Sequence, residues 1–99
     1  MNTQKPVYKL LIQTTALLTK AGAEDWALNF ADLAKAYREA DDILKEKHIA
    51  RQIVALYGGM GSFLDLVLYN HNNQFVADNE QLDALRHELH QEVIKVIQA

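Results

Sequence analysis

The chain has 99 residues, the size of one domain, and 49% of them are apolar, which is enough to build a core. It contains no cysteine, which excludes disulfides and thiolate metal sites, and its 13 acidic and 10 basic residues give a net charge of −3. This charge argues against nucleic-acid binding, which requires a basic patch, and is compatible with a basic protein partner.

Helical spacing begins with the first segment, Pro6 to about Ala21. Pro6 suits the first position of a helix, where its missing N–H group has no partner to lose. Gly22, which follows Lys20, is a typical helix stop. Apolar residues in the segment recur at three and four positions, as they do on one helix face. These residues are Val7, Leu10, Leu11, Leu17 and Leu18.

Two further helices are predicted over about Glu24 to Glu39 and about Asp42 to Tyr57. Asp41 or Asp42 can cap the later one by accepting a bond from a backbone N–H group. However, no Gly or Pro occurs between Ala23 and Tyr57. One long bent helix is therefore an open alternative.

A glycine-rich turn follows the third segment, and it is the strongest break in the chain. It comprises Gly58, Gly59, Gly61 and Ser62. We interpret it as a structural turn in which glycines adopt positive φ and let two helices pack closely. Phosphate binding is the less favoured alternative, because the Lys and Ser/Thr pair of a P-loop is missing. Ser62 and Asp65 resemble a capping box, with Asp in place of the usual Glu.

The apolar residues from Phe63 to Tyr69 predict a short helix, with a strand as the alternative. A polar loop follows, and Asp78 is predicted to begin the last helix, with Gln81 completing a capping box. The predicted fold is all-α: one domain over residues 1–99, forming a bundle of four or five helices with the glycine-rich turn before a short apolar helix.

No group of residues in the chain predicts catalysis. His87 and His90 lie three apart on one helix face, but no third ligand stands out, so we expect no metal site. The carboxylates of Asp41 and Asp42 resemble a solvated cap cluster more than a catalytic pair. Ser62, the only serine, has no histidine in a motif around it. We therefore predict a protein that is not an enzyme and has no cofactor.

Two polar surfaces are candidates for binding a protein partner, with ordinary solvent exposure as the alternative for both. The first is acidic and suits a basic partner, because complementary charge speeds encounter and fixes register. The second is a loop rich in hydrogen-bonding groups. The residues of the first are Asp32, Tyr37, Glu39, Asp41 and Asp42, and those of the second are Tyr69, Asn70 and His71.

The segment Met1 to Pro6 lacks a basic region followed by an apolar run, so no signal peptide is predicted. No apolar stretch approaches the roughly 20 residues of a membrane span. We expect a cytoplasmic protein without a membrane segment.

The run from Leu56 to Leu68 resembles a family of small bacterial proteins that share a Gly-Gly-Met-Gly-Ser segment followed by an apolar residue, an acid and an apolar run. Their preceding helical hairpin carries a Trp, here Trp26. Many members are expected to have Asn where this chain has Leu64. Small helical proteins of this kind resemble immunity proteins of bacterial toxin systems, including contact-dependent growth inhibition.

That resemblance implies tight binding to a cognate toxin domain, often a nuclease. The resulting hypothesis is an immunity protein that neutralises a toxin in the cytoplasm. The alternative is a small structural or regulatory module that forms a homodimer through a leftover apolar face, to which Ile12 and Ile94 can contribute. The sequence leaves open whether the chain is a monomer or a homodimer.

Overall fold

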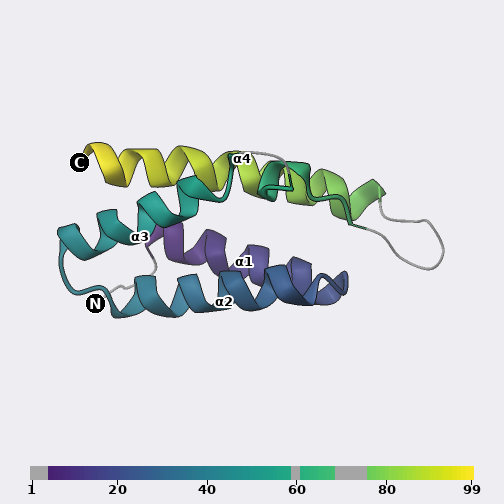
Figure 1. The fold of residues 1–99 in the computed structure, drawn as a ribbon, viewed down its shortest axis with the longest axis horizontal. Helices are drawn as coiled ribbons and strands as arrows, with labels where there is room; N and C mark the ends of the chain where they lie inside the picture. Colours follow the sequence, from purple (N-terminus) through teal and green to yellow (C-terminus); the bar gives the residue numbers. More distant parts are fainter. Residues whose placement is uncertain (1–4, 59–60, 69–75) are drawn as a thin grey trace.

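The computed structural model describes residues 5–58, 61–68 and 76–99, and these contain four α-helices, one short 3-10 helix and no strand (Figure 1). The elements are α1 (Pro6–Lys20), α2 (Glu24–Glu39), α3 (Ile43–Ala55), η1 (Phe63–Asp65) and α4 (Val76–Gln98). The predicted all-α bundle of four or five helices is confirmed.

The helices pack as a hairpin of α1 and α2 covered by α3 and α4. α1 packs against both α2 and α4, while α3 packs against α4 and α2 (Figure 1). The hairpin turns at Gly22, whose φ of 80° is left-handed. There the N–H of Gly22 donates to the carbonyl of Thr19, and the N–H of Ala23 donates to that of Leu18. This is a Schellman motif, which ends α1 where the sequence predicts.

α2 and α3 are separate helices, which settles the alternative of one long bent helix. Ala40 is extended, with φ −68° and ψ 120°, and Asp42 is extended as well. The side chain of Asp42 accepts a bond of 2.8 Å from the N–H of Lys45. Asp42 is therefore the N-cap of α3, one of the two predicted caps.

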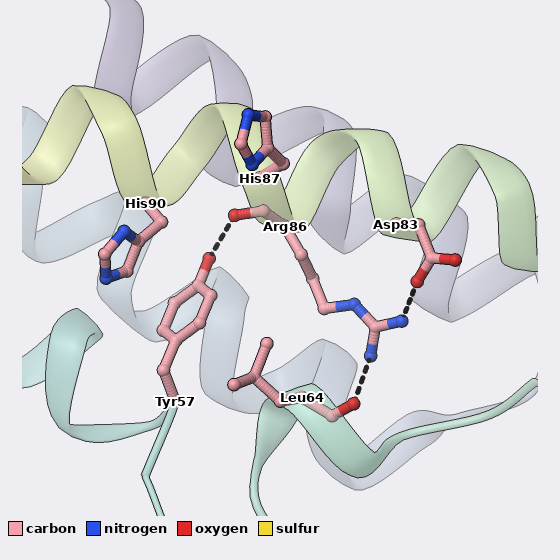
Figure 2. A pocket seen from close by; sticks show the side chains of 6 residues that line it. All are labelled: Tyr57, Leu64, Asp83, Arg86, His87 and His90. Atoms are coloured by element: carbon pink, nitrogen blue, oxygen red, sulfur yellow. Dashed lines mark hydrogen bonds and ion pairs between the residues drawn. The ribbon is translucent and has the colours of Figure 1, made fainter.

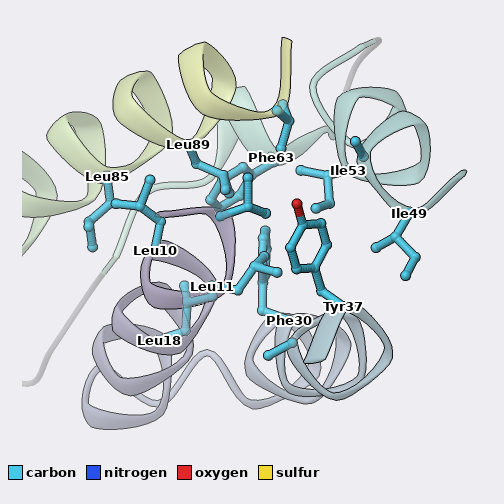
Figure 3. Close-up of a cluster of buried hydrophobic side chains, with 14 of the residues drawn as sticks. Leu10, Leu11, Leu18, Phe30, Tyr37, Ile49, Ile53, Phe63, Leu85 and Leu89 are labelled. Atoms are coloured by element: carbon cyan, nitrogen blue, oxygen red, sulfur yellow. The ribbon is translucent and has the colours of Figure 1, made fainter. Parts of the chain in front are cut away.

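The core contains a cluster of aromatic rings contributed by α2, by Tyr57 just after α3 and by η1. Figure 3 shows two of them, Phe30 and Phe63, among the buried side chains. Phe63 is fully buried. Its ring centroid lies 4.7 Å from that of Phe30, 5.4 Å from that of Tyr57 and 5.5 Å from that of Trp26. The Tyr57 ring meets it edge-on, a favourable arrangement for aromatic pairs. Phe63 thereby anchors η1 to the helices.

The short apolar helix predicted from Phe63 to Tyr69 is wrong within the described residues. Only the 3-10 turn Phe63–Asp65 forms, and Leu66 is extended. In an α-helix the carbonyl of Leu64 accepts from the N–H of Leu68. Here that N–H donates to Asn79 Oδ1 at 2.8 Å, and the Leu64 carbonyl accepts from Arg86. Bonds to α4 therefore replace those of a helix.

The predicted start of the last helix is also wrong. α4 begins at Val76, so Asp78 lies inside its first turn and is not the N-cap. The Asp78 carboxylate instead accepts from Lys20 Nζ at 3.1 Å, which ties the start of α4 to the end of α1. The proposed capping box with Gln81 is therefore absent.

Replacing Phe63 by Ala should lower the free energy of unfolding by about 3–5 kcal/mol, because it opens a cavity in the centre of the aromatic cluster. Leu28→Ala is the matched control, since Leu28 is an exposed apolar residue of α2. It should change stability by no more than about 0.5 kcal/mol. Urea unfolding followed by circular dichroism measures both. Equal losses in the two variants would contradict the central position of Phe63.

Candidate functional site

A groove of about 640 Å³ lies between α2 and α3, at the acidic surface that the sequence singles out. Its lining includes the apolar side chains of Ala36, Ala40 and Ile49, together with the carboxylates of Glu39 and Asp42. Because alanines occupy the α2 side, little side-chain volume fills the space between the helices. We refer to this feature as the α2–α3 groove.

Other residues of α3 complete the α2–α3 groove. Leu44 lines it and is 74% exposed, and the neighbouring Ile43 is also exposed. Lys45 and His48 lie along it too. The groove therefore combines apolar area with charged groups, the combination found in protein interfaces.

Only two of the four predicted acidic residues lie at the groove. Glu39 and Asp42 line the groove, whereas Asp32 and Asp41 are exposed without lining it. Asp41 accepts a bond of 2.7 Å from Lys45 Nζ. That hydrogen bond and the charge of Lys45 hold the pKa of Asp41 below its ordinary value. Lys45 thus offsets part of the negative charge at this surface.

Tyr37, a residue of the predicted acidic surface, is buried in the structure. It is only 2% exposed and lies in the core, on the face of α2 that carries Phe30 (Figure 3). Its hydroxyl donates to Glu46 Oε1 at 3.1 Å, and Glu46 also pairs with Lys5. Burial, followed by the nearby Glu46 carboxylate, raises the pKa of Tyr37. The residues of the second predicted surface, Tyr69, Asn70 and His71, lie outside the described residues.

The glycine-rich turn fulfils part of its predicted role. Gly61 has a φ of 72°, which favours glycine, but Gly58 does not have positive φ. A Cβ atom on either would meet no atom within 4 Å, so the predicted close packing at these two glycines is wrong. Gly59 lies outside the described residues.

Ser62 and Asp65 both cap the turn, in a variant of the predicted capping box. The Ser62 hydroxyl accepts from the N–H of Leu64 at 3.3 Å. The Asp65 carboxylate accepts from the N–H of Gly61 at 2.9 Å, one residue before the position that a capping box uses.

Arg86 of α4, which no prediction from the sequence included, holds the segment after the turn. The residue is 9% exposed, and its Nη1 donates to the carbonyl oxygens of Phe63, Leu64 and Leu66 at 2.7, 3.2 and 3.0 Å. Its Nη2 pairs with Asp83. A signal was present in the sequence, because Arg86 interrupts the apolar stripe of α4 between the buried residues Leu82 and Leu89.

A second hollow, of about 490 Å³, opens beside Arg86 (Figure 2). The Tyr57 hydroxyl donates to the Arg86 carbonyl at 2.7 Å, and the His90 ring meets the Tyr57 ring at a centroid distance of 5.0 Å. Figure 2 shows His87 and His90 pointing in different directions from α4. Among the described residues, no three His, Asp or Glu side chains are arranged to hold a metal ion.

Arg86→Met should lower the free energy of unfolding by about 2–4 kcal/mol, because it leaves buried carbonyl oxygens without a donor while keeping an apolar stem. Arg51→Met, at an exposed position of α3, is the control and should stay within about 0.5 kcal/mol. Urea unfolding gives both values. A loss at Arg86 no larger than that at Arg51 would show that the bonds to the carbonyls contribute little.

Burial raises the pKa values of Tyr37 and Tyr57 above the ordinary value of 10.0. Below about pH 9 both tyrosines are protonated in the folded and unfolded chains, so they leave the free energy of unfolding unchanged with pH. Above it the unfolded chain loses protons that the folded chain keeps, and the free energy of unfolding should fall by at most about 1.4 kcal/mol per pH unit for each tyrosine.

Urea unfolding at a series of alkaline pH values measures that slope. The Tyr37→Phe variant should have a shallower slope than the wild-type chain. An identical slope in both would contradict the assigned contribution of Tyr37.

The comparisons with known proteins place the chain by sequence. No curated protein and no solved structure matches it. A family described as a domain of unknown function, DUF6966, matches residues 19–77, from the end of α1 through η1 to the start of α4. Because this match covers more than half of the 99 residues, the chain belongs to the DUF6966 family.

Proposed function

We propose that this protein binds and neutralises a bacterial toxin domain in the cytoplasm, as an immunity protein, and that the α2–α3 groove receives the toxin. The single observation that carries the proposal is the groove itself. Its apolar lining, Ala36, Ala40 and Ile49, lies beside the carboxylates of Glu39 and Asp42. The glycine segment resembles that of small helical bacterial proteins, which in turn resemble immunity proteins, and this resemblance implies the same role.

The chemistry of the groove suits a basic partner with an apolar anchor. A few well-packed side chains near the centre of an interface supply most of its binding energy, and charges at the rim govern encounter and specificity. Leu44, 74% exposed at the groove, offers apolar area that a partner would bury. A nuclease toxin presents a basic surface, because it must hold nucleic-acid phosphates. Glu39 and Asp42 are the complementary groups.

Crossing a bilayer takes about 20 predominantly apolar residues, and no helix in the described part of the chain combines that length with sufficient apolar character.

The test uses a purified toxin domain encoded beside the gene for this chain. The double variant Glu39→Gln, Asp42→Asn removes two charges, while Asn at position 42 retains the cap of α3. At low salt its association rate constant with the toxin, measured by stopped-flow fluorescence, should fall about tenfold, because charge steering is lost. The control variant Glu24→Gln, Glu88→Gln removes two exposed carboxylates outside the groove. Its association rate constant should fall less than about twofold.

The wild-type chain should also abolish the activity of the toxin at equimolar concentration. A toxin that remains active in a large excess of the chain would overturn the proposal. Equal effects of the two double variants on the association rate constant would indicate that the toxin binds outside the groove.

A homodimeric structural or regulatory module is the second candidate function. Ile12 of α1 is exposed, as that alternative requires of an unpaired apolar face, while Ile94 is half-buried. Light scattering of the free chain separates the two functions. A dimer that Ile12→Ser dissociates, together with no inhibition of the toxin, would favour this candidate.

A further inference from the structure

A second surface with exposed apolar side chains lies at η1 and the residues after it. Leu64 and Val67 are 56% and 45% exposed, although both lie in a segment that α4 holds in place. Leu64 stands between hollows of about 490 and 370 Å³, and Val67 stands between the latter and one of about 270 Å³. We refer to this feature as the Leu64–Val67 ridge.

The ridge is a separate surface from the α2–α3 groove. Its three hollows are lined by Tyr57 and by residues of α2, the glycine-rich turn, η1, the segment after η1 and α4. None of these residues lines the groove. A partner can therefore occupy one surface without displacing an occupant of the other by direct overlap of contacts.

The segment that carries the ridge is fixed from two sides. Arg86 donates to the carbonyls of Leu64 and Leu66 on one side of Val67. Asn79 binds the backbone of Leu68 on the other: it accepts from the N–H at 2.8 Å and donates to the carbonyl at 3.0 Å. A surface that is ordered before binding loses less conformational entropy when a partner arrives. The ridge is therefore suited to docking.

The charges around the ridge are mostly negative. The carboxylates of Asp65, Glu80 and Asp83 line its hollows. The one lysine or arginine among the lining residues is Arg86, whose guanidinium already binds carbonyl oxygens and Asp83 and is almost entirely buried. An arriving molecule therefore meets apolar atoms and carboxylates, together with the rings of His87 and His90 at the hollow of about 490 Å³.

We propose that the Leu64–Val67 ridge docks a segment of a partner protein that carries apolar side chains interleaved with lysine or arginine. Apolar side chains of the segment would enter the hollows beside Leu64 and Val67, and its cations would face Glu80 and Asp65. This is the helix-in-groove mode of recognition, in which regularly spaced apolar anchors enter hydrophobic hollows. Charge complementarity with the carboxylates requires that the partner segment be positively charged.

The same charges disfavour the other occupants. In a symmetric dimer of this chain, the same surface patch meets itself, so the carboxylates of one copy would face those of the other. An anionic lipid surface would repel the same groups. A cationic amphipathic segment is not repelled by the carboxylates of the ridge, unlike a second copy of the chain or an anionic lipid surface.

The probes are three synthetic peptides of equal length and helical spacing, with Leu and Lys, Leu and Glu, or Ser and Lys on their two faces. They are titrated into the full chain labelled with ¹⁵N, and amide chemical shifts are followed. We expect the Leu/Lys peptide to shift amides of residues 61–68 and 79–90 and to bind at least about tenfold more tightly than either other peptide.

Two sets of variants locate the contact on the ridge. Leu64→Ser with Val67→Ser should weaken binding of the Leu/Lys peptide about tenfold, since both anchors are lost. Leu28 is an exposed apolar residue on α2. Leu28→Ser is therefore the control and should leave the affinity for the Leu/Lys peptide unchanged. Glu80→Gln should weaken binding at low salt and have less effect at high salt, because exposed charges are screened. It provides a readout that does not depend on folding of the serine variants.

Several results would overturn the inference. These are equal binding of the Leu/Glu peptide, unchanged affinity in the serine variants, or shifts confined to the α2–α3 groove. Dimerisation of the wild-type chain that the serine variants abolish would assign the ridge to a second copy, and binding to anionic vesicles through Leu64 and Val67 would assign it to lipid. None of these measurements uses the toxin, so failure here is distinguishable from failure of the proposed function.

Discussion

The position of Arg86 beneath the segment 63–66 is the constraint on which the connection between α3 and α4 depends. A guanidinium that donates to three backbone carbonyls satisfies groups that are costly to bury without a donor. It also fixes where Phe63 enters the aromatic cluster. The Tyr57 hydroxyl donates to the backbone carbonyl of Arg86, so the end of α3, η1 and α4 are joined at one residue.

This arrangement has an electrostatic consequence at the surface. Because the charge of Arg86 is satisfied by backbone carbonyls and by Asp83, the neighbouring hollows present apolar atoms, the carboxylates of Asp65 and Glu80 and the rings of two histidines to solvent. The α2–α3 groove is similar in charge, since Lys45 lies among its carboxylates and pairs with Asp41. At both surfaces one cation therefore offsets part of the acidic charge that a partner would meet.

Both candidate surfaces depend on features that do not maximise the stability of an isolated domain. Leu44, Leu64 and Val67 keep much of their apolar area in water, although 20 apolar residues of the described chain are buried in the core. Exposed apolar area beside fixed hollows is a common property of surfaces that bind other proteins. This combination, shared by a groove between two helices and a ridge on a short turn, is the physical basis of the binding role proposed for this member of the DUF6966 family.

The sequence by itself determined the elements whose causes are local. Apolar spacing placed the helix Glu24–Glu39, the glycine at position 22 ended the first helix, and Asp42 capped the third. Tertiary structure decided the rest. Residues 63–68 have a helix-like composition, yet Arg86, some twenty positions later, takes the carbonyls that a helix would use. Tyr37 carries a polar hydroxyl, yet packing of α2 buries it against Glu46. Spacing in the sequence reports which face of a helix a residue occupies, as it does for Arg86 on the apolar stripe of α4, but not which group lies opposite it.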